Sequence, residues 1–269
     1  MDYTQIGYDV AGGVATLELR RPARRNAWTR QMGVEVRDAL ARADVDDGVR
    51  ALVVTGAGKD FCVGADVEGG QGGVLQQTQK RAPLACWRVR KPVIGALRGA
   101  CAGVGATLPL QFDVRLAGTS ARFAFVFVRR GLVPEAASTW LLPRLVGMSR
   151  ASEILLAGRT VLADEALAIG LVSRVVPDDE VLGAAQALGR EIAIGTAPVA
   201  VALTKRLLWR MAAIRDPDAA DALDAAAFGW AKQTADAREG IRAFAEKRDP
   251  AWTMRPSVDL PDVDDLEDE

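Results

Sequence analysis

Short hydrophobic runs and helical patterns alternate along the first part of the chain. Runs rich in β-branched residues predict buried strands at residues 14–20, 49–56, 92–99 and 113–118. Between them, patterns of helical period cover residues 29–43 and roughly 74–87. Strands that alternate with helices form right-handed crossovers and a largely parallel sheet. The pattern therefore predicts an α/β core over residues 1–195.

Helical patterns dominate from about Ser149 onward. Ser149 is expected to cap the first of these helices, and the others are ADEALAIG, which ends at Gly170, and the segments 178–194, 197–214 and 217–234. Asp236 with Glu239 resembles a capping box at the start of REGIRAFAEKR. We therefore expect a C-terminal helical region over residues 196–256.

The composition, 49% hydrophobic and 26% charged residues, is that of an ordinary globular protein. Residues 257–269 carry seven acids and no base, and we expect them to form a disordered acidic tail. The rest of the chain then holds 34 basic and 28 acidic side chains, a net charge of +6. This surplus suits a phosphate-bearing ligand, but it is too scattered to indicate nucleic-acid binding.

No run of about 18 apolar residues predicts a membrane span. The N-terminus, MDYTQIGYDV, has neither the basic nor the apolar region of a secretory signal. We therefore expect a cytoplasmic protein with no membrane partner.

The chain contains no histidine, and this excludes several kinds of site. Neither a Ser-His-Asp or Cys-His triad nor a histidine-ligated metal can form. Cys62, Cys86 and Cys101 are odd in number and lack C-x-x-C spacing, which argues against a disulfide framework and a zinc site. We expect no metal, and we expect carboxylates to transfer protons.

Two glycine-rich segments each follow a predicted strand. KDFCVGADVEG (59–69) places Gly64 and Ala65 at a strand exit, where backbone N–H groups can face a ligand. GACAGVGATLPL (99–110) repeats this arrangement at the opening of a helix. Tight turns and close helix–sheet packing explain the same glycines without a ligand. If both segments face one pocket, their N–H groups supply what a developing thioester enolate needs.

A single carboxylate, Glu135, lies among apolar residues in GLVPEAASTW (131–140). Proline followed by an acid is typical of a helix N-terminus, where the acid faces the positive end of the helix dipole. An acid in apolar surroundings also has a raised pKa, which suits a catalytic base. These residues alone leave both interpretations open.

Four segments, in their order and spacing, resemble the enoyl-CoA hydratase/isomerase (crotonase) superfamily. They are RPARRNAW, FCVGADV, KPVIGALRGACAGVGATLPLQFDVRLAG and LADEALAIGLVSRVVP, and the resemblance runs from about residue 5 to residue 248. It implies an α/β fold, a crotonase-like spiral of ββα units followed by a C-terminal helical trimerisation region. It also implies a homotrimer or homohexamer that binds an acyl-CoA thioester. Coenzyme A then arrives as part of the substrate, and no separate cofactor is expected.

The resemblance also implies roles for individual residues. The backbone N–H groups of Ala65 and Val104 would form an oxyanion hole, with Val104 where many members have glycine. For coenzyme A, it points to Arg24 and Arg25 near the phosphates and to a loop around the adenine, formed by Val63, Ala65, Asp66 and Val67. Phe244 and Lys247 would reach the coenzyme A of a neighbouring subunit. Solvated arginines and an amphipathic last helix explain the same residues without a ligand.

Hydratases that the chain resembles use two glutamates, and the matching positions here hold Thr107 and Phe127. Neither side chain ionises at working pH, so efficient hydration is hard to support. GLVPEAAST and AGVGATL instead resemble the branch of peroxisomal Δ3,Δ2-enoyl-CoA isomerases, in which the acid after L-x-P is the base. The resemblance thus predicts an enoyl-CoA isomerase with Glu135 as the proton shuttle. Two alternatives stay open: a hydratase or other thioester-enolate enzyme that uses Glu135 with a water, and a non-catalytic acyl-CoA-binding oligomer.

Overall fold

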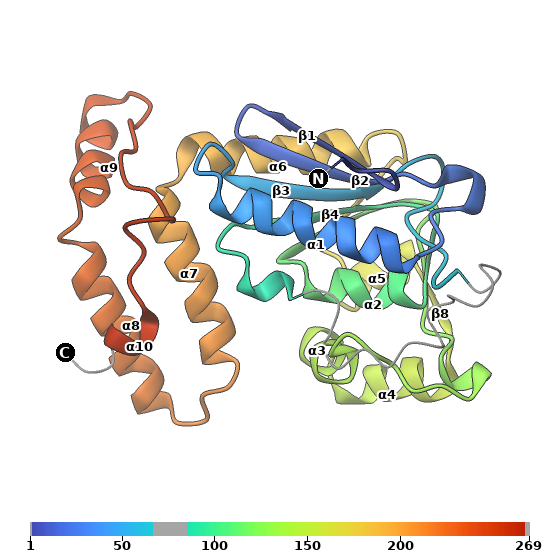
Figure 1. The fold of residues 1–269 in the computed structure, drawn as a ribbon. Coiled ribbons are helices and arrows are strands. Elements are labelled where there is room, and N and C mark those ends of the chain that lie inside the picture. The colour runs from blue at the N-terminus through green and yellow to red at the C-terminus, as the bar shows by residue number, and fades with distance from the viewer. Residues whose placement is uncertain (1, 67–84, 267–269) are drawn as a thin grey trace.

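The computed structural model describes residues 2–66 and 85–266, and its larger sheet has six strands (Figure 1). In spatial order they are β1 (Ile6–Ala11), β2 (Val14–Leu19), β3 (Ala51–Gly56), β4 (Val93–Leu97), β6 (Val114–Gly118) and β9 (Arg174–Val176). β1 pairs with β2 in antiparallel fashion, and every other neighbouring pair is parallel. The four strands predicted from the sequence are confirmed, and so is the α/β class.

Helices cover both faces of this sheet, as Figure 1 shows for α1 (Arg30–Val45) and α6 (Val181–Gly195). Met32 and Val36 of α1 join Leu17 of β2 in the main hydrophobic core. Val181 and Ala185 of α6 pack with strand residues in a second cluster on the opposite face. β3, in the middle, is buried along its whole length, as expected of a strand covered on both faces.

A smaller sheet holds β5 (Ala100–Ala102), β7 (Arg122–Ala124) and β8 (Thr160–Leu162). β5 continues from β4 through Gly99, which has a φ of +58°. A Cβ at Gly99 would lie 2.1 Å from the carbonyl oxygen of Lys59, so only glycine fits. This close approach brings the chain after β4 against the chain after β3. The short helix α2 (Val104–Thr107) and a 3₁₀-helix (Leu108–Gln111) follow β5 directly.

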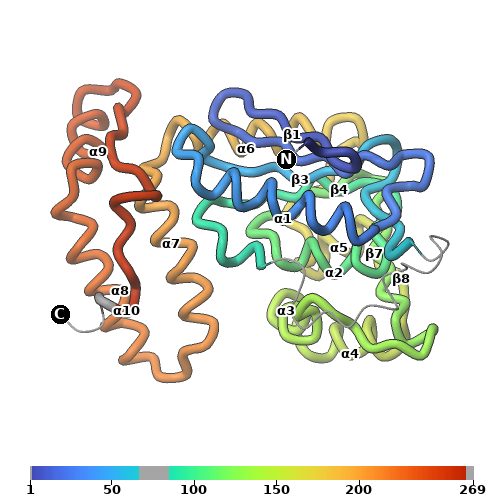
Figure 2. Tube along the Cα trace, viewed as in Figure 1, coloured from blue at the N-terminus to red at the C-terminus, as the bar shows by residue number. Residues whose placement is uncertain are grey.

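The remaining helices confirm the helical second half. They are α3 (Ser138–Val146), α4 (Met148–Ala157), α5 (Ala163–Ala168), α7 (Pro198–Met211), α8 (Pro217–Ala231) and α9 (Ala235–Glu246). The N-cap of α4 is Gly147 rather than the expected Ser149. Most of the helix expected at residues 74–87 lies outside the described residues, and Cys86–Arg88 forms a single 3₁₀ turn. α7, α8 and α9 form an arm beside the α/β core (Figure 2).

Within the described ranges, no single helix is long and apolar enough to cross a membrane. The pair α6 and α7 passes that test by length and composition, with a bend of 118° between the two helices.

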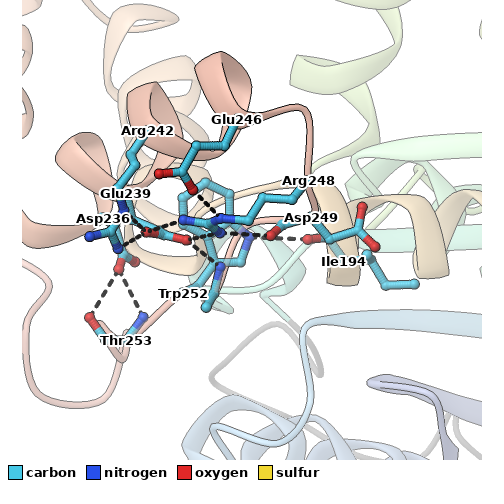
Figure 3. Close-up of polar contacts among 10 residues, drawn as sticks. Ile194, Asp236, Glu239, Arg242, Glu246, Arg248, Asp249, Trp252 and Thr253 are labelled. Carbon is cyan, nitrogen blue, oxygen red and sulfur yellow. Dashed lines mark hydrogen bonds and ion pairs between the residues drawn. The ribbon is translucent and has the colours of Figure 1, made fainter.

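The chain beyond α9 returns along this helix and is held by two buried acids (Figure 3). Asp236 Oδ1 accepts hydrogen bonds from the backbone N–H groups of Thr253 and Met254, and Glu239 accepts one from Ala251. The expected capping box is therefore wrong, because both acids bind the returning chain. Thr234 is the N-cap of α9, and its hydroxyl accepts from the N–H of Ala237 at 3.1 Å.

The acidic C-terminal segment differs from the disordered tail that its charge suggests. Val263, in α10 (Val263–Leu266), is only 7% exposed and packs in one cluster with Leu203 of α7 and Leu223 of α8. Arg206 of α7 donates a hydrogen bond to the carbonyl oxygen of Pro261 at 3.0 Å. Leu260 and Val263 pack against the arm, whereas Asp262 and Asp264 beside Val263 are exposed. Residues 267–269 lie outside the described chain.

Candidate active site

The loop that leaves β3 is joined edge to edge with β5, and the two form the base of the candidate site. The N–H of Cys62 donates to the carbonyl oxygen of Ala100 at 3.0 Å, and the N–H of Ala102 donates to that of Cys62 at 2.9 Å. Further along, Gly64 and Gly103 face each other so closely that a Cβ on Gly103 would lie 3.5 Å from Gly64 Cα. These contacts bring the loop that carries Ala65 beside the start of α2.

The backbone N–H groups of Ala65 and Val104 have no acceptor among residues 2–66 and 85–266. Val104 is the first residue of α2, so its N–H has no partner within the helix. On either side of Ala65, Trp28 N donates to Gly64 O at 2.7 Å and Asp66 N donates to Trp28 O at 2.8 Å. This pairing directs the N–H of Ala65 away from Trp28. Two free donors on adjoining loops can serve as an oxyanion hole.

Thr107 lies about one helical turn after Val104 in α2, and its side chain contacts Glu135. The buried Thr107 hydroxyl donates a hydrogen bond to Glu135 Oε1 at 2.5 Å. Glu135 is exposed as a whole residue, yet its carboxyl group is crowded by protein atoms. This desolvation raises the pKa of the carboxyl group, and the hydrogen bond from Thr107 partly opposes the rise. The short helix α2 thus links Val104, Thr107 and Glu135.

Glu135 does not belong to the first turn of a helix. α3 begins at Ser138, and the residues between, Ala136 and Ala137, have φ values of 57° and 59°. This left-handed conformation costs an L-residue about 1–2 kcal/mol. The interpretation of Glu135 as a helix-start acid is therefore wrong. Strained backbone of this kind is found at functional sites, although two alanines gave no sign of it in the sequence.

Phe127 is half-buried and precedes the 3₁₀ turn Val128–Arg130. Glu135 forms no ion pair and no hydrogen bond with another carboxyl group in the part of the chain that the structure describes. The site as described therefore offers one carboxylate for proton transfer.

Arg24 and Arg25, expected near the coenzyme A phosphates, are engaged with carboxylates of the Ala65 loop. Arg25 Nε donates to Asp60 Oδ2 at 2.7 Å, and Arg24 lies 3.4 Å from Asp66. The arginine side chains are 56% and 45% exposed. Hydrogen bonding from Arg25 lowers the pKa of Asp60, which also accepts the N–H of Ala100 at 2.8 Å. Asp60 was not among the site residues expected from the sequence, although an acid in the short segment between a buried strand and a glycine-rich loop was a usable signal.

The other expected coenzyme A residues are placed in two regions. Val63 is half-buried in the Ala65 loop, and its N–H donates to the carbonyl oxygen of Arg25 at 3.3 Å. Val67 lies outside the described residues. Phe244 and Lys247 belong to the end of α9, on the arm away from α2 (Figures 1 and 2). Phe244 is 88% exposed, and neither residue meets the other site residues within one chain.

Among the described residues, no cluster of three or more Cys, Asp and Glu side chains is arranged to hold a metal ion. Cys62, Cys86 and Cys101 are free and buried. Burial raises the pKa of Cys62 and Cys86 to about 12, so these thiols stay protonated at neutral pH.

Comparison with known proteins gives a consistent result. The model of the enoyl-CoA hydratase/isomerase family matches residues 9–255. An enoyl-CoA hydratase from Alternaria alternata is 38% identical over 249 residues, which cover 90% of this chain and 83% of that protein. The 1,2-epoxyphenylacetyl-CoA isomerase of Escherichia coli is 36% identical over 91% of this chain and 96% of that protein. A crystal structure of a probable enoyl-CoA hydratase/isomerase from Mycobacterium abscessus superposes with a TM-score of 0.86 at 36% identity, covering 93% and 99%.

Proposed function

Because the chain belongs to the enoyl-CoA hydratase/isomerase family, we propose that it is an enoyl-CoA isomerase that converts a 3-enoyl-CoA to the trans-2 isomer. The observation that carries this proposal is Glu135, the one carboxylate that the Thr107 hydroxyl bonds among residues 2–66 and 85–266. A hydratase of this family would place glutamates where this chain has Thr107 and Phe127. One carboxylate is enough for a proton shift, since the same group removes the proton and returns it.

In the proposed mechanism, the thioester oxygen lies between the N–H groups of Ala65 and Val104. Glu135 removes a proton from C2, and the electrons of the C2–H bond move to the thioester oxygen to form a dienolate. The two N–H groups stabilise that charge, and one such donor contributes about 10²–10³ in rate. The electrons on the thioester oxygen then return and form the C2–C3 double bond, while the electrons of the C3–C4 double bond take the proton from Glu135 onto C4 and leave Glu135 as a carboxylate. No water or further cofactor enters the balance.

The environment of Glu135 suits both halves of this cycle. Desolvation raises its pKa, which makes the carboxylate a stronger base toward C2. The Thr107 hydroxyl favours the ionised form and so keeps the carboxylate available. Glu135 is thus suited to accept a proton and to return it within one turnover.

Binding of coenzyme A belongs to the same proposal. The half-exposed Arg24 and Arg25 would meet the phosphates, and the loop with Val63, Asp66 and Val67 would surround the adenine. Phe244 and Lys247 would act on the coenzyme A of a neighbouring subunit, because α9 lies away from α2 within one chain. The protein would then be a homotrimer or homohexamer, with coenzyme A carried only as part of the substrate.

A second candidate function is hydration of a 2-enoyl-CoA. Two observations favour it: the relative from Alternaria alternata is named a hydratase, and solvent reaches Glu135. Glu135 would then activate a bound water without a second acid. The two functions differ in whether oxygen from water enters the acyl chain.

The deciding experiment supplies 3-enoyl-CoA and 2-enoyl-CoA substrates in ¹⁸O-labelled water and follows the products by mass spectrometry. We expect 3-enoyl-CoA to become trans-2-enoyl-CoA without ¹⁸O in the acyl chain. Rapid accumulation of labelled 3-hydroxyacyl-CoA from the 2-enoyl substrate would show a hydratase instead. If neither substrate is consumed, the isomerase and the hydratase proposals are both wrong, and another thioester-enolate reaction or a non-catalytic acyl-CoA-binding oligomer is left.

The Glu135→Gln variant tests the role of the carboxylate itself. It keeps the shape of the side chain and removes the proton carrier, so we expect kcat to fall by at least ~10²-fold with fold and acyl-CoA affinity retained. Glu191→Gln, at an exposed position of α6, is the matched control and should leave kcat unchanged. A Glu135→Gln enzyme within a few-fold of the wild type would contradict the proposed function.

A further inference from the structure

Gln111 is a fully buried polar residue whose amide joins two separate segments of backbone. Its Nε2 donates to the carbonyl oxygen of Ala136 at 3.2 Å, and its Oε1 accepts from the N–H of Cys86 at 3.3 Å. Ala136 provides an acceptor and Cys86 a donor, so a single orientation of the Gln111 amide satisfies both hydrogen bonds. The Ala136 bond is made one residue after Glu135.

The turn that follows Glu135 has three backbone carbonyl groups, and one of them, that of Ala136, is bonded by the Gln111 amide. The carbonyl oxygen of Glu135 accepts from Ser138 N at 3.1 Å, and that of Ala137 accepts from Leu141 N at 2.9 Å in the first turn of α3. The carbonyl oxygen of Ala136 has Gln111 as its partner within the described residues. Buried backbone acceptors need such a partner.

The same turn is strained at both of its central residues. Ala136 and Ala137 have φ values of 57° and 59°, a conformation that glycine adopts freely and alanine does not. Such a conformation persists only where surrounding contacts hold it. A change of sign in φ at Ala136 would redirect the chain at Glu135 and withdraw its carboxyl group from Thr107.

We propose that Gln111 is a positioning residue that holds the turn after Glu135 in its left-handed conformation and thereby fixes the catalytic carboxyl group. This inference rests on the proposed role of Glu135 as the base. Thr107 ends α2 and Gln111 ends the 3₁₀-helix that follows it directly, and their side chains bond the carboxyl group of Glu135 and the carbonyl oxygen of Ala136. The segment that begins with the Val104 N–H therefore holds Glu135 at two points, its carboxyl group and the backbone after it.

The Gln111→Met variant tests this role because methionine fills a similar volume without a hydrogen bond. A small displacement of a reacting group costs up to about 10²-fold in rate, so we expect kcat to fall by about 10- to 100-fold with KM within about threefold of the wild type. The acid limb of the kcat profile should move to lower pH, because a carboxyl group released to solvent loses the desolvation that raises its pKa, and this outweighs the loss of the smaller, opposing effect of the Thr107 hydrogen bond. Gln186→Met is the matched control. Gln186 belongs to α6, away from the site, and its side chain donates a hydrogen bond to the Thr16 hydroxyl at 3.1 Å.

A second substitution separates positioning from general stability. Glycine at residue 136 adopts a positive φ without strain, so Gln111→Met/Ala136→Gly should recover at least about threefold in kcat over Gln111→Met. Equal kcat in the two variants would overturn the inference. So would a Gln111→Met enzyme with an unchanged kcat and acid limb, provided that Glu135→Gln is inactive.

If Gln111→Met does not fold, Gln111→Asn carries the same test, because its shorter side chain keeps a buried amide but cannot span both partners. The same loss of kcat and the same recovery with Ala136→Gly are expected, and their absence would overturn the inference. An active Glu135→Gln enzyme would instead contradict the proposed function, so the two failures are distinguishable.

Discussion

At the level of single residues, the protonation of Glu135 depends on two opposing influences. Desolvation by the surrounding protein raises the pKa of its carboxyl group, and the hydrogen bond from the Thr107 hydroxyl lowers it. A base must be ionised to act, so kcat should fall as the pH drops through this pKa. The position of that acid limb therefore responds both to the burial of the carboxyl group and to its contact with Thr107.

Replacing Thr107 by valine removes the hydroxyl and nearly preserves the shape of the side chain. The carboxylate then loses a donor that stabilises its charge, so its pKa rises further and the acid limb of kcat should move to higher pH. A pH profile of single-turnover rates measures the shift. This direction is opposite to that expected for Gln111→Met. An acid limb at the same pH in Thr107→Val and in the wild type would mean that the Thr107 hydroxyl does not bond the carboxylate during turnover.

The sequence revealed some of these residues and not others. Glu135 stood out because it is a lone acid among apolar residues in a chain without histidine. The left-handed turn at Ala136 and Ala137 was unpredictable, because alanine carries no local preference for positive φ. Gln111 in LPLQF was the only polar side chain of an apolar stretch, but its two partners are 25 residues away in either direction along the chain.

At the level of elements, Asp60 joins three segments that carry the site. Its carboxylate accepts from Arg25, in the segment after β2, and from Ala100 N at the start of β5, and it precedes the Ala65 loop. The strands that deliver these segments were predictable from their hydrophobic runs. The connections were not, since they depend on side-chain hydrogen bonds between positions about 40 residues apart.

Asp60→Asn should weaken this junction with little change of shape. The amide can still accept from Ala100 N, but it loses the charge that pairs with Arg25. We expect about 1–2 kcal/mol lower free energy of unfolding at neutral pH, a modest figure because Arg25 is half-exposed and solvent screens the pair. Denaturant titrations measure this loss, and Asp9→Asn, at an exposed position of β1, is the control.

The same variant has a predictable pH dependence. The pKa of Asp60 is lower in the folded chain, so its stabilising effect is complete above the unfolded pKa of about 3.9 and is lost as the pH falls through the folded value. The difference in the free energy of unfolding between the wild type and Asp60→Asn should therefore become smaller below about pH 4. A difference that is constant with pH would show that the charge of Asp60 does not contribute.

At the level of the whole molecule, the acidic C-terminal segment is part of the fold of the arm. Charge composition predicted disorder, but Val263 meets α7 and α8 in one apolar cluster. Composition averages over a segment, whereas packing depends on which few residues face a neighbour. This is why the sequence identified the helices of the arm and missed the segment that packs against them.

Val263→Ala and Val258→Ala form a matched pair within this segment. Val263 is 7% exposed and Val258 is 65% exposed. We expect Val263→Ala to lower the free energy of unfolding by about 1–2 kcal/mol, since it removes buried methyl groups and leaves a cavity. Val258→Ala should change it by less than about 0.5 kcal/mol. Equal effects in thermal or denaturant unfolding would indicate that the segment does not pack in solution.

Assembly of the protein depends on the arm. Phe228, Ile241 and Phe244 are each at least 71% exposed, and the first two line an apolar groove of about 410 Å³ between α7, α8 and α9. Exposed apolar surface of this kind marks contact sites. This surface agrees with the trimer or hexamer that the resemblance to crotonases implies, so we expect light scattering to give three or six times the 28.6 kDa of one chain.

Ile241→Asp should shift that mass toward a single chain, because it places a charge on the apolar surface, whereas Val45→Asp, at an exposed end of α1, should not. If Lys247 serves the coenzyme A of a neighbouring subunit, the dissociated Ile241→Asp protein should also show a higher KM for acyl-CoA. Its kcat should fall less, because Glu135 and both N–H donors belong to one chain. A wild-type protein of 28.6 kDa at all concentrations, with an ordinary KM, would contradict both the assembly and the shared site.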